Sequence, residues 1–273
     1  MPALALADWP FLENLNLSKT NLSLQGVEAI LDLSKWEQLK SLDVSQNELF
    51  DEGLSTLALV DWPLLESLNL SQVECSPKGV EALVNQSKWS QFKHLDISNN
   101  EIFDEGVAVL TLAEWPLLEE LNLKNTKITQ KGLEILVHQI KLEKLKKLDI
   151  SENIISDEGF KILASGEWSL FQHLVCYDTQ VTRKGQISFL ENMKWPNLTH
   201  LEHSLNESFY NYDESQEQWS PSETILASVP MCYMKQSLMV TVLNTTWLSS
   251  KDLHLSIEHY YLNEKVIILR AIS

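Results

Sequence analysis

Cysteine is scarce in this sequence, and long apolar runs are missing from it. Cys75, Cys176 and Cys232 are far apart and lack zinc-type spacing, which argues against a disulfide framework and a zinc finger. No run reaches about 18 apolar residues, so we expect no membrane span. The opening segment MPALALADWP lacks the basic region and cleavage site of a secretory signal. We therefore expect a cytoplasmic protein in a reducing compartment.

Positive charge is also in short supply. Lys and Arg number 21 against 38 Asp and Glu, which gives a formal net charge of −17. A field of this sign repels phosphate backbones, so we expect no nucleic-acid partner, and the lack of a span predicts no membrane partner. The negative charge favours encounter with a basic protein. An equally good explanation is that it keeps a repeat protein soluble.

In place of these features the sequence has a period. The tryptophans are spaced alternately by 27 and 26 residues, if Leu142 is counted at the one position of the series where a tryptophan is missing. The glycines, apart from Gly166, keep the same alternation. The tryptophans of this series stand at 9, 36, 62, 89, 115, 168 and 195, and its glycines at 26, 53, 79, 106, 132, 159 and 185. Two markers in phase indicate a stacked structural unit, repeated in pairs of 53 residues.

Each unit combines a strand pattern with a helix pattern. Segments such as LENLNL and LKKLDI alternate apolar with polar residues at their ends, and stretches such as GVEAILDLSKW have helical spacing. The glycine is expected to let the helix start approach neighbouring backbone, and the tryptophans to stack on their equivalents. The expected helix caps are the hydroxyls of Ser23, Ser76, Thr129 and Thr182. At the other helices Asp51, Asp104 and Asp157 are expected to cap, or to interact favourably with the dipole of, their own helix.

These units resemble the leucine-rich repeat, and the alternation of two repeat types makes them most similar to the ribonuclease-inhibitor-like class. The resemblance covers residues 1–206, about seven to eight repeats with the first one truncated. It implies an α/β solenoid (horseshoe) with a concave parallel sheet and convex helices. In this family an asparagine after the strand forms a buried ladder to backbone groups, a role that the resemblance carries to Asn47, Asn100, Asn153 and Asn206.

The two ends differ from the middle. The chain opens on half a repeat helix, which fits either a truncated array or a minimal cap. Because no repeat covers the edge before Leu12, Leu15 and Leu17, we expect self-association there. Residues 207–273 are expected to form a C-terminal cap or small β-rich module. Its predicted elements are a helix from the capping box SPSE at 220–223, and strands in SLMVTVL, DLHLSIEHYYL and KVIILRAI.

The sequence predicts no catalytic residues, no cofactor and no metal. The repeated Asp-Glu pairs are explained by helix capping. Cys176 takes an inward strand position equivalent to Leu70 and Ile97, where a thiol is inert. His173 and His200 should lie side by side, but a zinc site would need two further ligands such as Glu202 and Asp178, so surface histidines are favoured.

One place on the expected concave face breaks the polar pattern. The outward strand positions are polar through six repeats: Asn16, Asp43, Asn69, Asp96, Asn122 and Asp149. The seventh repeat has Val175 there and Tyr177 at the next outward position, a composition typical of binding hot spots. The candidate partner-binding residues are therefore His173, Val175, Tyr177, Asp178, His200 and Glu202. The tail aromatics Tyr210, Tyr212 and Trp219 are expected to line the same end. The alternative is that the repeat decays near its cap and the tail folds back over Val175 and Tyr177.

The favoured function is a non-enzymatic protein–protein interaction scaffold that binds a partner, expected to be basic, on its concave face. The alternative is the recognition arm of a larger catalytic assembly, such as a ubiquitin ligase or a secreted bacterial effector. An effector would be delivered into a host cytosol and would act on a host protein.

Overall fold

The structure, a computed structural model, describes residues 9–33, 36–86, 89–139, 142–204, 210–213, 218–221 and 239–243. Over most of this length short strands alternate with helices. The strands are β1 (Asn14–Asn16), β2 (Ser41–Asp43), β3 (Ser67–Asn69), β4 (His94–Asp96), β5 (Glu120–Asn122), β6 (Lys147–Asp149), β7 (His173–Cys176) and β8 (His200–Ser204). The helices are α2 (Leu24–Leu33), α3 (Phe50–Ala58), α4 (Pro77–Gln86), α5 (Phe103–Leu110), α6 (Gln130–Gln139), α7 (Ser156–Ala164) and α8 (Arg183–Asn192).

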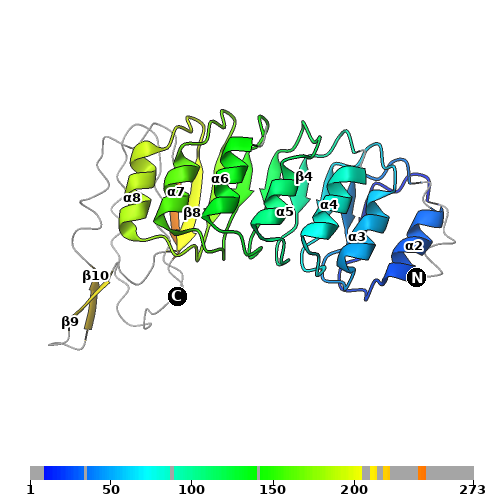
Figure 1. The fold of residues 1–273 in the computed structure, drawn as a ribbon, viewed down its shortest axis with the longest axis horizontal. Coiled ribbons are helices and arrows are strands. Elements are labelled where there is room, and N and C mark those ends of the chain that lie inside the picture. Colours follow the sequence, from blue (N-terminus) through cyan, green and yellow to red (C-terminus); the bar gives the residue numbers. More distant parts are fainter. Residues whose placement is uncertain are drawn as a thin grey trace.

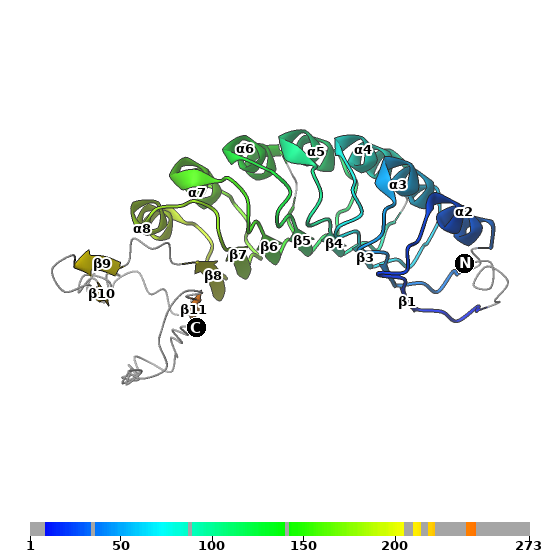
Figure 2. The same ribbon diagram turned by 90° about the horizontal axis from the view of Figure 1, so that it is seen from below.

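Strands β1 to β8 form one parallel sheet in chain order, and β11 (Met239–Leu243) joins it beside β8. The sheet keeps a constant register, in which Leu42 lies beside Leu68 and Leu68 beside Leu95. Figure 2 shows an arc with the strands on its inner side and helices α2 to α8 on its outer side. Figure 1 shows the same helices as one row. The predicted solenoid, with a concave sheet and convex helices, is confirmed.

The strands follow from a period of two residues. In β2 the central Leu42 is 1% exposed and Val44, two residues later, is fully buried, whereas Asp43 between them is half-buried on the other face. Alternation of this kind places apolar side chains toward the helices and polar side chains toward the concave face. One strand and one helix cannot enclose a core, so each repeat is stabilised by its neighbours.

Aromatic rings fill the core where helices return to strands. Trp62 stacks on Trp89 with ring centroids 6.3 Å apart, and Trp168 stacks on Trp195 at 5.5 Å. The predicted stacking of equivalent tryptophans is thus confirmed for these two pairs. The indole N–H of Trp195 also donates to the carbonyl of Gly166 at 2.8 Å. These contacts tie the end of each helix to the following repeat.

The acidic residues at the starts of α3, α5 and α7 lie in the first turn, as a favourable interaction with the helix dipole requires, but they do not cap those helices. They cap the next helix along the chain. Asp51 Oδ1 accepts from the backbone N–H groups of Ser76 and Gly79 at 2.8 and 3.0 Å, and its Oδ2 accepts from the Ser76 hydroxyl at 2.7 Å. The same arrangement joins Asp104 to Thr129 and Gly132, and Asp157 to Thr182. Each carboxylate therefore clamps two repeats together.

The glycines at the helix starts are crowded, as predicted. The crowding atoms belong mainly to side chains, whereas the sequence predicted neighbouring backbone. A Cβ added to Gly79 would lie 2.6 Å from Asp51 Oδ1, so the clamp itself occupies that space. A Cβ on Gly106 would lie 2.7 Å from the Cβ of Ile102 in the preceding loop. Glycine is therefore required for two different reasons in the two repeat types.

Part of the C-terminal module is described. Strands β9 (Tyr210–Asp213) and β10 (Gln218–Pro221) pair antiparallel. The helix predicted to open at Pro221 does not begin there, because Pro221 ends β10; proline is tolerated at the edge of a two-stranded ribbon, where no ladder donor is needed. Strand β11 falls within the predicted strand SLMVTVL, whereas Asn206, residues 222–238 and the last two predicted strands lie outside the described residues.

Candidate functional site

The outward residues that end strands β1 to β6 form a polar row on the concave face. Asp43 Oδ1 accepts from the backbone N–H of Ser45 at 2.9 Å, and the other Asn and Asp residues of the row hold the residue two places later in the same way. Some members also join across strands, since Asn122 donates to Asp96 Oδ2 at 2.9 Å. Much of the hydrogen-bonding capacity of this row is thus used within the molecule.

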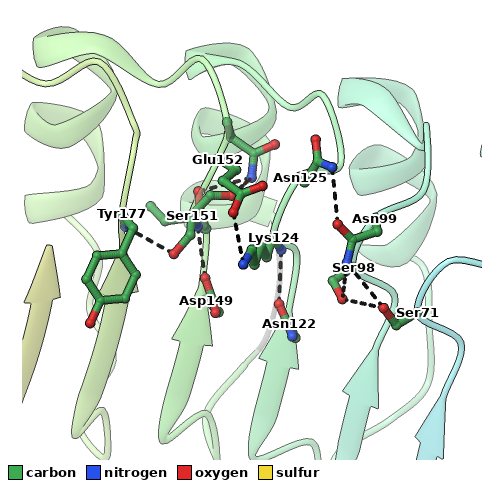
Figure 3. A network of polar contacts seen from close by, with 12 residues as sticks. Ser71, Ser98, Asn99, Asn122, Lys124, Asn125, Asp149, Ser151, Glu152 and Tyr177 are labelled. Carbon is green, nitrogen blue, oxygen red and sulfur yellow. Dashed lines mark hydrogen bonds and ion pairs between the residues drawn. The ribbon is translucent and has the colours of Figure 1, made fainter. Parts of the chain in front are cut away.

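A second polar network follows the ends of the strands, as Figure 3 shows. It contains Ser71, Ser98, Asn99, Lys124, Asn125, Ser151 and Glu152, joined by side-chain hydrogen bonds and one ion pair. At one end of the network the Ser151 hydroxyl accepts from the backbone N–H of Tyr177 at 3.0 Å (Figure 3). Tyr177 is therefore anchored to the preceding repeat through its backbone.

Glu202 of β8 brings together two of the predicted site residues of the β7 repeat. Its Oε1 lies 2.6 Å from His173 Nε2, and its Oε2 accepts from the Tyr177 hydroxyl at 2.7 Å. The rings of His173 and His200 lie side by side, with centroids 5.1 Å apart. Val175 lies in register with Glu202. We call His173, Val175, Tyr177, His200 and Glu202 the β7–β8 cluster.

The predicted site residues differ in exposure. Val175 is 7% exposed and is therefore buried beside the cluster. The side chains of His173 and Glu202 are 25% and 28% exposed, and His200 is exposed. Asp178 is exposed one residue beyond Tyr177, with a backbone φ of 50°. The polar and aromatic members of the cluster are thus more accessible than Val175.

The electrostatics of the cluster follow from burial and hydrogen bonding. Burial alone would raise the pKa of Glu202, but the hydrogen bonds from Tyr177 and His173 outweigh it and lower that pKa below its ordinary value. Burial, followed by the bond to Glu202, raises the pKa of the Tyr177 hydroxyl. Next to the cluster, burial raises the pKa of Asp149 despite its hydrogen bonds with Ser151. The cluster therefore holds a stabilised carboxylate, Glu202, and a destabilised one, Asp149, lies on the far side of Val175.

Neither described cysteine is placed for chemistry. Cys176 is 1% exposed, as expected from its inward strand position, and burial raises the pKa of its thiol well above the ordinary value. Burial also raises the pKa of the Cys75 thiol, to about 12. Within the described ranges no three His, Cys, Asp or Glu side chains gather as metal ligands, and no helix among those residues is long and apolar enough to cross a membrane.

The asparagines after alternate strands are buried and fully hydrogen-bonded. Asn100 Oδ1 accepts from the backbone N–H groups of Val73 and Cys75 at 3.1 and 3.2 Å. Its Nδ2 lies 2.8 Å from the carbonyl of Leu70 and 2.9 Å from that of Ile97. Asn47 and Asn153 make equivalent bonds in their own repeats. Threonine at the equivalent position of the alternate repeats satisfies fewer backbone groups, since the Thr126 hydroxyl donates to a single carbonyl.

The bond between Tyr177 and Glu202 was not predicted. The sequence suggested Glu202 only as a possible further ligand beside His173 and His200, although the constant repeat step places residue 202 opposite Val175 in the sheet. Which way the carboxylate and the phenol then turn depends on side-chain rotamers, which the repeat pattern does not specify.

Comparison with known protein families supports the repeats of the solenoid. Residues 38–58, 92–110 and 141–164 each match the family described as Leucine Rich repeat. A comparison with curated protein sequences finds no match. Among solved structures, a chain of the yeast Rad7–Elc1 complex aligns at 15% identity with a TM-score of 0.41, over 74% of this chain and 65% of that one. An internalin, InlF of Listeria monocytogenes, aligns at 22% identity with a TM-score of 0.45, over 72% of this chain and 55% of that one.

The chain thus spans less than two thirds of the length of either structure. The family match rests on three separate repeats, each of which contains a strand or helix of the solenoid. Those repeats, together with the unbroken order of strand and helix from β1 to β8, show that the chain contains leucine-rich repeats stacked in one solenoid.

Proposed function

We propose that this chain is a non-enzymatic interaction scaffold that binds a protein partner on its concave face, at the β7–β8 cluster. One observation carries the proposal. Glu202 holds Tyr177 and His173 together as a half-buried aromatic and charged group, on a face where β1 to β6 each end on an outward Asn or Asp. Tyrosine in a partly desolvated setting is typical of residues that dominate binding energy at interfaces.

The cluster is also organised before a partner arrives. Both oxygens of Glu202 are engaged, which restricts the rotamers of Tyr177 and His173. A side chain that is already fixed avoids an ordering cost of about 0.5–1.5 kcal/mol on binding. Val175, in register with Glu202, is 7% exposed, so the cluster also contains a buried apolar side chain.

We expect the contacting surface of the partner to be basic. Asp43, Asp96 and Asp149 lie in the outward row, and the chain as a whole has a formal net charge of −17. A Lys or Arg of the partner beside Asp149 would lower the raised pKa of that carboxyl. Affinity should therefore increase as the pH rises through the pKa of Asp149, and it should fall with salt.

Site-specific photocrosslinking in the native cell tests the location. A benzophenone amino acid is introduced at His200, which is exposed on β8, and separately at Glu134, which is exposed on α6. The proposal predicts a protein adduct from the His200 position that is missing from the Glu134 position. Equal adducts from both positions, or adducts from α6 alone, would contradict the concave-face site.

A further inference from the structure

Two phenylalanines at the starts of α3 and α5 have properties that the fold does not require. Phe50 and Phe103 occupy equivalent positions, 53 residues apart. Their exposed fractions are 45% and 41%, and their φ angles are 56° and 55°. Bulky residues rarely adopt this left-handed region, and a half-exposed ring recovers only part of the free energy of burial.

The repeat needs this backbone conformation but not the ring. The backbone N–H of Phe103 donates to the carbonyl of Thr126 in the next repeat at 3.0 Å. At the third equivalent position Ser156 has a φ of 59°, and its N–H donates to the carbonyl of Thr179 at 3.2 Å. A serine therefore supports the same inter-repeat bond, so the two phenyl rings are an addition to what folding demands.

Both rings are bracketed by exposed carboxylates. Glu48 and Glu52 flank Phe50 in the segment ELFDEG, and Glu101 and Glu105 flank Phe103 in EIFDEG. Among the described residues none of these four glutamates forms an ion pair. Uncompensated negative charge around an exposed aromatic ring suits a ligand that has both apolar side chains and cations.

We propose that Phe50, Phe103 and these four glutamates, here called the Phe50–Phe103 edge, form a second docking surface. Its occupant would be a basic amphipathic segment of a partner protein, with two apolar anchors and flanking Lys or Arg. The surface lies in the second and fourth repeats, away from the β7–β8 cluster, and does not depend on the function proposed for that cluster.

The spacing of the two rings limits the ligand. Figures 1 and 2 show α4 between α3 and α5, so the rings are two repeat steps apart. Steps of about 4.8 Å at strands and 8–10 Å at helices separate the rings by about 10–20 Å. A helix rising about 1.5 Å per residue covers that distance in roughly 7–13 residues. One helical segment of ordinary length can therefore reach both rings.

A fluorescent peptide of Leu and Lys, patterned as an amphipathic helix about 14 residues long, serves as the probe. One control peptide replaces Leu with Ser and keeps the charge, and another replaces Lys with Glu and keeps the apolar face. We expect the wild-type protein to bind the Leu/Lys peptide at least about tenfold more tightly than either control, as measured by fluorescence anisotropy. No binding of the Leu/Lys peptide, or equal binding of the Ser/Lys peptide, would overturn the proposal.

Variants locate the binding. The double variant Phe50→Ser, Phe103→Ser should lose at least about tenfold in affinity, and its melting temperature should not fall, because Ser156 adopts the same backbone conformation. The matched control is Leu59→Ser, Leu112→Ser, which removes side chains that are 68% and 70% exposed just after α3 and near the end of α5. The control should stay within about twofold of wild type. An equal loss in both double variants would mean unspecific apolar adhesion and would overturn the proposal.

Charge and independence are tested in the same assay. Glu48→Gln, Glu101→Gln should weaken binding and reduce its dependence on salt. Tyr177→Ala should leave the affinity for the peptide within about twofold of wild type. A large loss in Tyr177→Ala with none in the phenylalanine variant would place the peptide on the β7–β8 cluster, which contradicts the second surface while leaving the first proposal standing.

Discussion

Single side chains take over backbone hydrogen bonding wherever a strand of this solenoid ends. At Asn100 one amide satisfies two N–H groups on one side and backbone carbonyls on the other. These groups are buried, so water does not replace a lost partner. The fold therefore depends on particular residues at the ends of strands, even though each strand is only three to five residues long.

Asn100→Ala should lower the free energy of unfolding by about 1–3 kcal/mol, because it leaves buried backbone groups without partners. Urea denaturation gives the change. The control is Asn14→Ala on β1, an exposed position for which the described contacts include no side-chain hydrogen bond. It should stay within about 0.5 kcal/mol of wild type, and equal stability of both variants would contradict the ladder role.

Glu202→Gln should destabilise the protein in a pH-dependent manner. Since the pKa of Glu202 is lowered in the folded state, its ionised form contributes stability above the pKa of an unfolded glutamate, about 4.3. That contribution is lost as the pH falls through the folded-state pKa. Thermal melts should show a gap between wild type and variant at pH 7 that closes below about pH 4. A gap that stays constant down to pH 3 would mean that ionisation of Glu202 contributes nothing.

At the scale of elements, the helices are joined by clamps that reach across repeats. A local reading of the sequence assigned Asp51 to its own helix, because caps are normally sought within a few residues. Its true partners, Ser76 and Gly79, lie 25 and 28 residues later. The period of Trp and Gly predicted the strands, helices and their order, since it records which residues are buried. The period does not indicate whether a polar side chain bonds within its own repeat or to the next one.

Asp104→Ala should cost about 1–2 kcal/mol of unfolding free energy, because the start of α6 loses its cap and Thr129 loses an acceptor. The adjacent Glu105→Ala is the matched control; Glu105 is exposed in the same turn and should change stability by less than about 0.5 kcal/mol. Amide hydrogen exchange should also show faster exchange at Gly132 in the Asp104 variant. Equal losses in both variants would indicate a simple effect of charge.

On the scale of the whole molecule, the difference between strand and helix widths curves the stack into the arc of Figure 2. This curvature, and the position of the outward row within it, follow from the sequence. The β7–β8 cluster follows only in part, because the bridge through Glu202 depends on how side chains turn after the repeats are stacked. The exposed rings of Phe50 and Phe103 were not predicted, since helical spacing suggests burial for any apolar residue near a helix start.

The amino-terminal edge should associate with other molecules. Phe11 is 86% exposed and Trp9 is 40% exposed, beside Leu12 and Leu15, which are only partly buried. Light scattering should detect self-association that increases with concentration, and Phe11→Ser should reduce it. A strictly monomeric wild-type protein at high concentration would show that this edge is adequately covered.

The central test compares how tightly wild type and Tyr177→Ala bind the protein partner that is crosslinked at position 200. We predict a loss of at least about fivefold, which corresponds to about 1 kcal/mol, in a variant that stays folded, although losing the hydrogen bond to Glu202 lowers its free energy of unfolding modestly. Glu120→Ala, on the same face in β5, should bind as wild type does. Unchanged affinity together with lost stability would contradict the concave-face interaction site and would leave Tyr177 with a purely structural role.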